Sequence, residues 1–194
     1  MGSDRGKLVI ISGPSGAGKS TVVRKLLERC PLPLRLSVSA TTRPPRAGER
    51  DGVDYYFLSH QEFARRRAAG EFLECKEVFG RGDWYGTLRQ ETSTGLAAGK
   101  WVILEIDVEG ALDVMAECPE AITIFLHPGS AEELERRLRG RGTEREDTIN
   151  WRLNAARREM TFRDRYRHEA INDDVDRVTR EICNLLKSYL GDIS

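Results

Sequence analysis

The chain has 194 residues, a length typical of one compact domain or of one domain that carries inserted lobes. Basic residues (Lys plus Arg) and acidic residues (Asp plus Glu) number 31 each, and this net charge of zero gives no reason to expect nucleic acid as a partner. The hydrophobic fraction of 39% excludes a disordered chain, and no apolar run approaches the roughly 20 residues that would span a membrane.

Three short β-branched runs have the length and composition of buried strands: 7–12, 101–108 and 121–127. Their almost continuous apolar character is typical of a parallel sheet that is covered on both faces. Helical periodicity follows the first run at 22–30 and returns at 149–160, and a last helix begins near Asp173 and Asp174. Strands that alternate with helices predict an α/β sandwich with right-handed crossovers.

Two segments interrupt this alternation. Residues 37–91 contain the run TTRPPRAGERDG and then short mixed runs rich in Tyr, Phe and Glu, which predict an inserted small β lobe with one helix near 60–69. Residues 128–148 hold the run RLRGRGTERED, whose arginines and glycines predict a mobile segment.

The run GPSGAGKS at 13–20 matches the phosphate-binding pattern G-x-x-x-x-G-K-[ST] and lies between a predicted strand and a predicted helix. Its glycines would let the backbone adopt positive φ and turn its N–H groups toward phosphate oxygens. Lys19 would neutralise the β- and γ-phosphates, and the Ser20 hydroxyl would bind Mg²⁺. A glycine-rich turn alone would not need Lys and Ser here. The residues predicted to bind ATP are Gly13, Pro14, Ser15, Gly16, Ala17, Gly18, Lys19, Ser20 and Thr21.

A carboxylate near the end of the predicted strand 101–108 supports this site. Asp107 would lie beside the phosphate loop, where a carboxylate can hold Mg²⁺ or its water shell. The alternative is that Asp107 caps a helix or forms a turn before Gly110. We predict Ser20 and Asp107 as the metal-binding residues, with Asp107 acting through water.

The cysteines and the N-terminal residues indicate the compartment. Cys30, Cys75, Cys118 and Cys183 are far apart in the sequence, and no histidine pair accompanies them. We therefore expect four reduced thiols, with neither a disulfide framework nor a zinc site. The start of the chain has too short an apolar run for a secretory signal, so we expect a cytoplasmic protein without a membrane partner.

Several separated motifs together resemble the guanylate kinase family. They are GPSGAGKST at 13–21, SVSATTRPPRAGERDGVDYYF at 37–57, GEFLE at 70–74, WYGT at 84–87, LEIDVEGA at 104–111, RLRGRGTE at 137–144 and INDD at 171–174. The resemblance implies an α/β fold of the P-loop NTPase type, a three-layer sandwich around a parallel sheet with an inserted small α/β lobe for the nucleoside monophosphate and a mobile lid. It also implies reversible, Mg²⁺-dependent transfer of the γ-phosphoryl group of ATP to GMP, and by expectation to dGMP, giving ADP and GDP in purine metabolism.

The resemblance also divides one contiguous kinase domain into parts. These are core at 1–36, the GMP-binding lobe at 37–91, core at 92–127, the lid at 128–154 and C-terminal core helices at 155–194. The sequence leaves open whether the protein is a monomer or a homo-oligomer.

The resemblance places the GMP site in the inserted lobe. The family's phosphate-binding positions fall on Arg43, Arg46, Tyr55 and Tyr85, and two guanidinium forks with two phenol donors suit a phosphate dianion. Its guanine-reading positions fall on Ser39, Glu74, Thr87 and Asp107, and Glu105, where some members have Asp, completes the set. The Glu74 carboxylate can accept hydrogen bonds from guanine N1–H and the 2-amino group. Adenine offers neither donor, so the pocket would reject it.

The lid would supply further cations. Arg137, Arg141 and Arg152 match the family's arginines that reach the triphosphate and the transferring group, and with Lys19 and Arg43 they are the predicted catalytic residues. Phosphoryl transfer depends on positioning and positive charge, and GMP needs no general base because its phosphate is largely ionised at neutral pH. The resemblance places Asn172 near the adenine of ATP, although a turn before the last helix explains this residue equally well.

Two alternatives remain at this point. One is an inactive guanylate-kinase-like module that binds proteins, and the other is a related small kinase with a different phosphorylated acceptor. Lys19, Ser20 and the lid arginines favour an enzyme, because such modules typically have a degraded phosphate loop. Glu74 with Ser39 and Thr87 favours guanine as the base.

Overall fold

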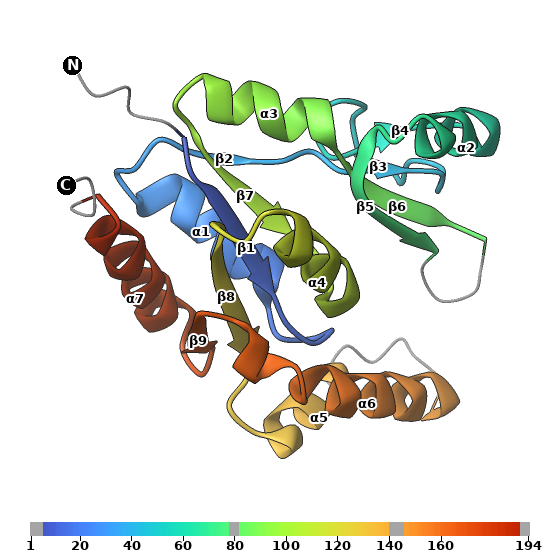
Figure 1. Cartoon of the computed structure of the whole chain (residues 1–194). Helices are drawn as coiled ribbons and strands as arrows, with labels where there is room; N and C mark the ends of the chain where they lie inside the picture. Colours follow the sequence, from blue (N-terminus) through green and yellow to red (C-terminus); the bar gives the residue numbers. More distant parts are fainter. Residues whose placement is uncertain (1–5, 78–81, 140–145, 191–194) are drawn as a thin grey trace.

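The computed structural model describes residues 6–77, 82–139 and 146–190. At its centre lies a five-stranded parallel sheet in the order β2-β7-β1-β8-β9 (Figure 1). Its strands are β1 (Leu8–Ser12), β2 (Leu34–Leu36), β7 (Trp101–Glu105), β8 (Ile122–His127) and β9 (His168–Ile171). The three predicted buried strands and the parallel sheet are confirmed. The predicted strand 101–108 is shorter than expected because Val108 begins a helix that Asp107 caps.

Helices cover both faces of this sheet. They are α1 (Lys19–Arg29) and α7 (Val175–Ser188) on one face, with α3 (Arg89–Ala97) and α4 (Val108–Glu117) on the other. Alternate residues of β1 explain the two layers, since Val9 and Ile11 pack toward α1 and α7 whereas Leu8 and Ile10 pack toward α4. The predicted three-layer α/β sandwich is therefore observed.

A second sheet forms a small lobe beside the core, at the upper right in Figure 1. Its order is β4-β3-β6-β5, with β3 (Ala40–Thr41), β4 (Tyr56–Phe57), β5 (Phe72–Glu77) and β6 (Trp84–Leu88). Helix α2 (His60–Ala68) packs on it, and the Phe63 ring stacks on Phe72 with 4.5 Å between ring centroids. The helix expected near 60–69 is confirmed.

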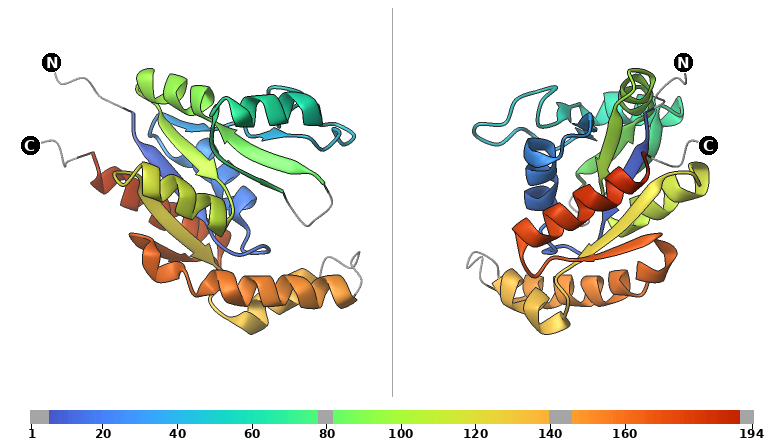
Figure 2. Two further views of the ribbon diagram at one scale, coloured as in Figure 1. Left: turned by 45° about the vertical axis from the view of Figure 1, so that its right-hand side comes forward. Right: turned by 90° about the vertical axis from the view of Figure 1, so that its left-hand side faces the viewer.

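Two helices lie along the lower edge of the molecule in Figures 1 and 2. They are α5 (Ala131–Arg139) and α6 (Glu146–Met160). Leu134 and Leu138 of α5 form a small core with Ile149 and Leu153 of α6. Helix α5 was not predicted from the sequence, because only two leucines interrupt its charged residues. Among the described helices, none combines the length and apolar character of a membrane span.

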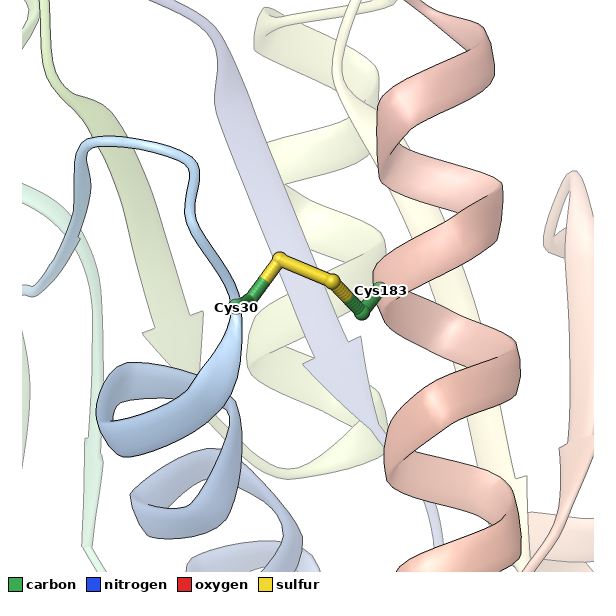
Figure 3. The surroundings of a disulfide bond; sticks show 2 residues. All are labelled: Cys30 and Cys183. Atoms are coloured by element: carbon green, nitrogen blue, oxygen red, sulfur yellow. A yellow bond between two sulfur atoms is a disulfide. The ribbon is translucent and has the colours of Figure 1, made fainter.

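A disulfide joins α1 to α7 and corrects the expectation of four reduced thiols (Figure 3). Cys30 follows the last residue of α1, Cys183 lies in α7, and their Cα atoms are 5.7 Å apart. The pair was missed because 153 residues separate the two cysteines in sequence, while the shared core of α1 and α7 brings them together in space. Cys75 and Cys118 are free thiols.

Candidate active site

The P-loop (residues 13–20) connects β1 to α1, and its glycines have the expected backbone conformation. Gly13, Gly16 and Gly18 have φ angles of 144°, 91° and 88°, so the predicted positive φ is confirmed. A Cβ atom at Gly13 would lie 1.9 Å from the carbonyl oxygen of Leu126. Only glycine allows the loop to pass this close to β8.

Lys19 is the first residue of α1 and folds back over the P-loop. Its Nζ donates hydrogen bonds to the carbonyl oxygens of Gly13 at 2.6 Å and Pro14 at 3.3 Å. Burial lowers the pKa of Lys19, and the negative charge of Glu105 opposes this shift. The ammonium group thus lies at the loop with neutral carbonyl partners, where a phosphate anion would be a stronger acceptor.

The carboxylate that reaches the P-loop is that of Glu105. Glu105 ends β7 and pairs in register with Ile11 of β1, so the sheet sets it beside the start of the loop. The Ser20 hydroxyl donates a hydrogen bond to Glu105 Oε1. Ser20 and Glu105 therefore form an oxygen-rich pair at the first turn of α1, which Thr21 also occupies.

Asp107 faces a different group of residues. Its Oδ1 accepts a hydrogen bond from the Gly110 N–H at 2.8 Å, which is the helix-capping contact weighed in the sequence analysis. Its Oδ2 lies 3.0 Å from Nζ of Lys76 in the lobe. The metal-binding role of Asp107 stays a prediction, and its observed partners are a backbone amide and a lysine.

The lobe contains a cavity of about 280 Å³ that brings most of the predicted GMP-binding residues together. It is lined by Ser39, Tyr55, Glu74, Lys76, Tyr85, Gly86, Glu105, Ile106 and Asp107. Thr87, which pairs in register with Glu74, donates a hydrogen bond from Oγ1 to Glu74 Oε1 at 2.6 Å. Strands β5 and β6, the residues just before β3 and β4, and the segment from the end of β7 to α4 thus supply the walls of one polar pocket.

Burial dominates the electrostatics of Glu74. It raises the pKa of the carboxyl to about 7, against the hydrogen bond from Thr87, and the negative charge of Asp107 adds to the rise. A Cβ atom at Gly110 would lie 2.9 Å from Glu74 Oε2 and 3.4 Å from Asp107 Oδ1. The two carboxylates therefore converge on the first turn of α4, and glycine at 110 leaves room for them.

Arg43 lies at the tyrosine end of this cavity. Its Nε donates to the Tyr85 hydroxyl at 3.1 Å, and its guanidinium lies 5.4 Å from the centre of the Tyr55 ring. Glu49 accepts two hydrogen bonds from Nη1 and Nη2 at 3.0 and 2.9 Å, and this pairing raises the pKa of Arg43. The backbone N–H of Arg46 also donates to Glu49, at 2.7 Å. The loop is thus organised around an acidic residue that the sequence analysis did not single out.

A second cavity of about 480 Å³ lies at the P-loop. Its walls come from the loop, the end of β5, the start of α4 and α6: Gly13, Ser15, Lys19, Lys76, Glu77, Glu105, Ile106, Asp107, Glu109, Trp151, Arg152, Ala155, Arg158 and Glu159. It shares Lys76, Glu105, Ile106 and Asp107 with the lobe cavity. The P-loop and the lobe pocket therefore adjoin along one wall.

Two of the three predicted lid arginines lie at the P-loop. Arg152 is buried and donates from Nη2 to the Ser15 hydroxyl at 2.6 Å. Arg137 donates from Nη2 to the backbone carbonyl of Asn172 at 2.6 Å and from Nε to Glu133 at 2.7 Å. Arg141 lies outside the described residues.

Asn172 contacts the backbone of the P-loop. Its buried side chain donates from Nδ2 to the carbonyl oxygen of Ala17 at 2.7 Å, and a Cβ atom at Gly18 would lie 2.5 Å from this nitrogen. The adenine contact implied by the resemblance stays a prediction, and the observed role is to hold the loop backbone.

Several charged residues of the site were not predicted, among them Glu49, Lys76 and Glu159. Glu159 lines the P-loop cavity, where burial raises the pKa of its carboxyl and the charge of Lys19 opposes the rise. For Lys76 the sequence did contain a signal, since a residue two positions after Glu74 on a strand shares its face. Glu49 reaches Arg43 through local contacts within its own loop, whereas Glu159 reaches the P-loop cavity through the packing of α6.

Comparisons with known proteins agree on one family. The family model described as Guanylate kinase matches residues 5–189. A guanylate kinase of Rhodopirellula baltica is 61% identical over 182 residues, which cover 93% of this chain and 87% of the relative. A guanylate kinase of Synechococcus sp. is 46% identical over 182 residues, which cover 94% of this chain and 82% of the relative.

Solved structures give the same result. The crystal structure of guanylate kinase from Anaplasma phagocytophilum has a TM-score of 0.78 at 33% identity, covering 98% of this chain and 89% of that chain. A shikimate kinase from Bacteroides thetaiotaomicron, at 15% identity and a TM-score of 0.50, shares the fold alone. Because the sequence match spans almost the whole chain and the P-loop and lobe pocket are both in place, the chain belongs to the guanylate kinase family.

Proposed function

We propose that this protein transfers the γ-phosphoryl group of ATP to GMP and gives ADP and GDP in a reversible reaction. The observation that carries this proposal is the shared wall of the two cavities, formed by Lys76, Glu105, Ile106 and Asp107. A triphosphate bound at the P-loop and a monophosphate bound in the lobe would therefore lie in adjoining cavities. The phosphoryl group could pass from one nucleotide to the other without entering bulk solvent.

The donor nucleotide would bind through the P-loop. The backbone N–H groups of residues 15–21 and the N-terminus of α1 offer partial positive charge to its phosphates. Lys19 would exchange its carbonyl partners for phosphate oxygens. Arg152, already at Ser15, together with Arg137 and Arg141 would add positive charge around the transferring group.

The residues at Ser20 fit Mg²⁺. A hydroxyl and a carboxylate are oxygen donors, and Mg²⁺ typically takes only one or two carboxylates beside water and substrate phosphates. We assign the carboxylate to Glu105, because Ser20 donates a hydrogen bond to it, and Asp107 is the alternative. Bound Mg²⁺ would neutralise charge on the phosphates.

GMP would bind in the lobe with its base at Glu74 and its phosphate at Arg43. Glu74 would accept hydrogen bonds from N1–H and the 2-amino group, while Ser39, Thr87 and Asp107 complete the polar surroundings of the base. Arg43, Arg46, Tyr55 and Tyr85 would bind the phosphate. Glu49 would hold the Arg43 fork in place until the phosphate arrives.

The chemical step needs charge and alignment. An ionised oxygen of the GMP phosphate attacks the γ-phosphorus, and the bond from that phosphorus to the ADP oxygen breaks. Lys19 and the arginines stabilise negative charge on the transferring group, and no proton has to be removed from the attacking oxygen near neutral pH.

The alternative functions fit the site less well. A protein-binding module would not need Lys19 folded on the loop or Arg152 bound to Ser15. A kinase for another base would not need the buried pair of Glu74 and Thr87.

The choice of base can be tested directly. An ADP-release assay with GMP, AMP, UMP and CMP in parallel should give turnover with GMP and a preference of about 10⁴-fold over AMP. Equal rates with AMP and GMP would overturn the proposed base recognition, and no turnover with any acceptor would favour the binding module.

We also propose that the protein acts on free nucleotides in the cytoplasm, without nucleic acid or a membrane as a partner. The balanced charge of the chain supports the absence of a polyanionic partner. Thiol trapping in rapidly quenched cells would test the compartment. Trapped thiols at Cys30 and Cys183 would support a reducing cytoplasm, whereas a persistent disulfide between them, which is unusual there, would contradict it.

A further inference from the structure

Lys76 lies where the two cavities meet. It is two residues after Glu74 in β5, so both side chains project from the same face of the strand. The antiparallel register pairs Lys76 with Tyr85 and Glu74 with Thr87, which puts all four residues on the pocket side of the lobe sheet. Among the described residues that line the lobe cavity, Lys76 is the one cation.

The Lys76 ammonium group connects the lobe to the core. Its Nζ lies 3.0 Å from Asp107 Oδ2 and 2.6 Å from Glu109 Oε2 at the start of α4. The other oxygen of Asp107 accepts the Gly110 N–H. Both carboxylate oxygens of Asp107 are therefore held, one from each side, which fixes the rotation of the group.

This contact opposes a repulsion inside the pocket. Glu74 and Asp107 both approach the position of a Cβ at Gly110, at 2.9 and 3.4 Å. The negative charge of Asp107 disfavours the charged form of Glu74 and the positive charge of Lys76 favours it, so Lys76 offsets a repulsion between the two carboxylates. A carboxylate oxygen that accepts one hydrogen bond can still accept a second from a ligand.

We propose that Lys76 is a positioning residue for guanine recognition, which holds the Asp107 carboxylate in the orientation that accepts a hydrogen bond from the guanine 2-amino group. The inference rests on the proposed function, because it needs GMP in the lobe cavity. Lys76 acts through Asp107 and need not touch the nucleotide itself.

The test compares GMP with IMP, which keeps N1–H and O6 but lacks the 2-amino group. In Lys76→Met, kcat/KM for GMP should fall about 10- to 100-fold, as expected for the loss of one hydrogen bond to a charged group. The loss should lie in KM for GMP, while kcat at saturating GMP, KM for ATP and kcat/KM for IMP stay within about twofold of the wild-type values. Lys76→Arg should restore most of the preference for GMP.

Two further variants make the test specific. In an Asp107→Asn background, Lys76→Met should have no additional effect, because the group that Lys76 positions has already been changed. Lys100→Met removes an exposed lysine outside both cavities and should behave as wild type. Lys76→Gln serves as a second variant if Lys76→Met does not fold.

The outcomes are distinct. An equal loss for GMP and IMP would show a merely structural role and overturn the inference, and so would an unchanged KM for GMP or full additivity with Asp107→Asn. Wild-type turnover with GMP is measured in the same series, so a failed proposed function would be recognised before any variant is compared.

Discussion

Glu74 is buried, and its proposed binding of guanine requires negative charge. Burial and the nearby Asp107 favour its neutral form and raise its pKa to about 7, so the free carboxyl changes protonation close to neutral pH. A protonated carboxyl loses acceptor capacity toward the two donors of guanine. Binding of GMP should therefore depend on pH in a range where an exposed glutamate would not.

We expect kcat/KM for GMP to fall as the pH decreases through about 7 and to reach a plateau above it. The direction follows from the raised pKa, because Glu74 holds its proton up to a higher pH and becomes an acceptor only once that proton is lost. A pH profile from 5.5 to 9 measures this effect. The GMP phosphate titrates near pH 6, so Glu74→Gln should lose the upper inflection and keep the lower one. A wild-type profile without an inflection near 7 would contradict this role.

Burial also acts against the charged form of Lys19, and for this basic group it lowers the pKa. Its burial disfavours the charged form in the free protein, so its removal should not reduce the free energy of unfolding. Lys19→Ala should lower kcat by about 10²-fold or more, since one charged donor at the transferring group is lost. Single-turnover kinetics and thermal melts of the same preparation measure both quantities. Normal turnover in this variant would remove Lys19 from the mechanism.

At the scale of elements, α1 begins at the end of the P-loop and packs against α7. The disulfide between Cys30 and Cys183 fixes the end of α1, whose other end carries Lys19 and Ser20 (Figure 3). The helices also share an apolar core, so the disulfide adds to a contact that packing already provides.

Reduction of this disulfide should lower the free energy of unfolding by about 2–5 kcal/mol, because the unfolded chain gains conformational entropy when the long loop between the two cysteines is no longer closed. Urea denaturation with and without dithiothreitol measures the difference. Cys30→Ser is the matched control, since it should be as unstable as the reduced wild type and insensitive to the reductant. Equal stability of the oxidised and reduced wild-type protein would contradict the expected contribution.

Elements with a continuous apolar run or a fixed motif spacing could be predicted from the sequence, whereas short and partly exposed strands could not. Continuous apolar runs identified β1, β7 and β8, and Gly, Lys and Ser at fixed spacing identified the P-loop. The edge strands β2 and β9 are short and partly exposed, so they carry little apolar signal. The assignment of Asp107 was open because sequence cannot decide which of two carboxylates, Glu105 or Asp107, turns toward Ser20.

Over the whole molecule, the lobe lies toward the top and helices α5 and α6 lie at the bottom of both views in Figure 2. The lobe and α6 both line the P-loop cavity. The lobe contributes the end of β5 to the cavity, and α6 contributes Arg152 and Glu159. A nucleotide in each cavity would contact both sides and favour a closed arrangement that excludes water. We expect full closure only when both substrates are bound, so ATP alone should be hydrolysed slowly.

The fate of the γ-phosphate tests this account most directly. With γ-labelled ATP and Mg²⁺, the label should appear in GDP when GMP is present, and its release as inorganic phosphate without GMP should be slower by at least about 10²-fold. Label that appears as inorganic phosphate at the same rate with and without GMP would contradict transfer between two nucleotides held across a shared wall.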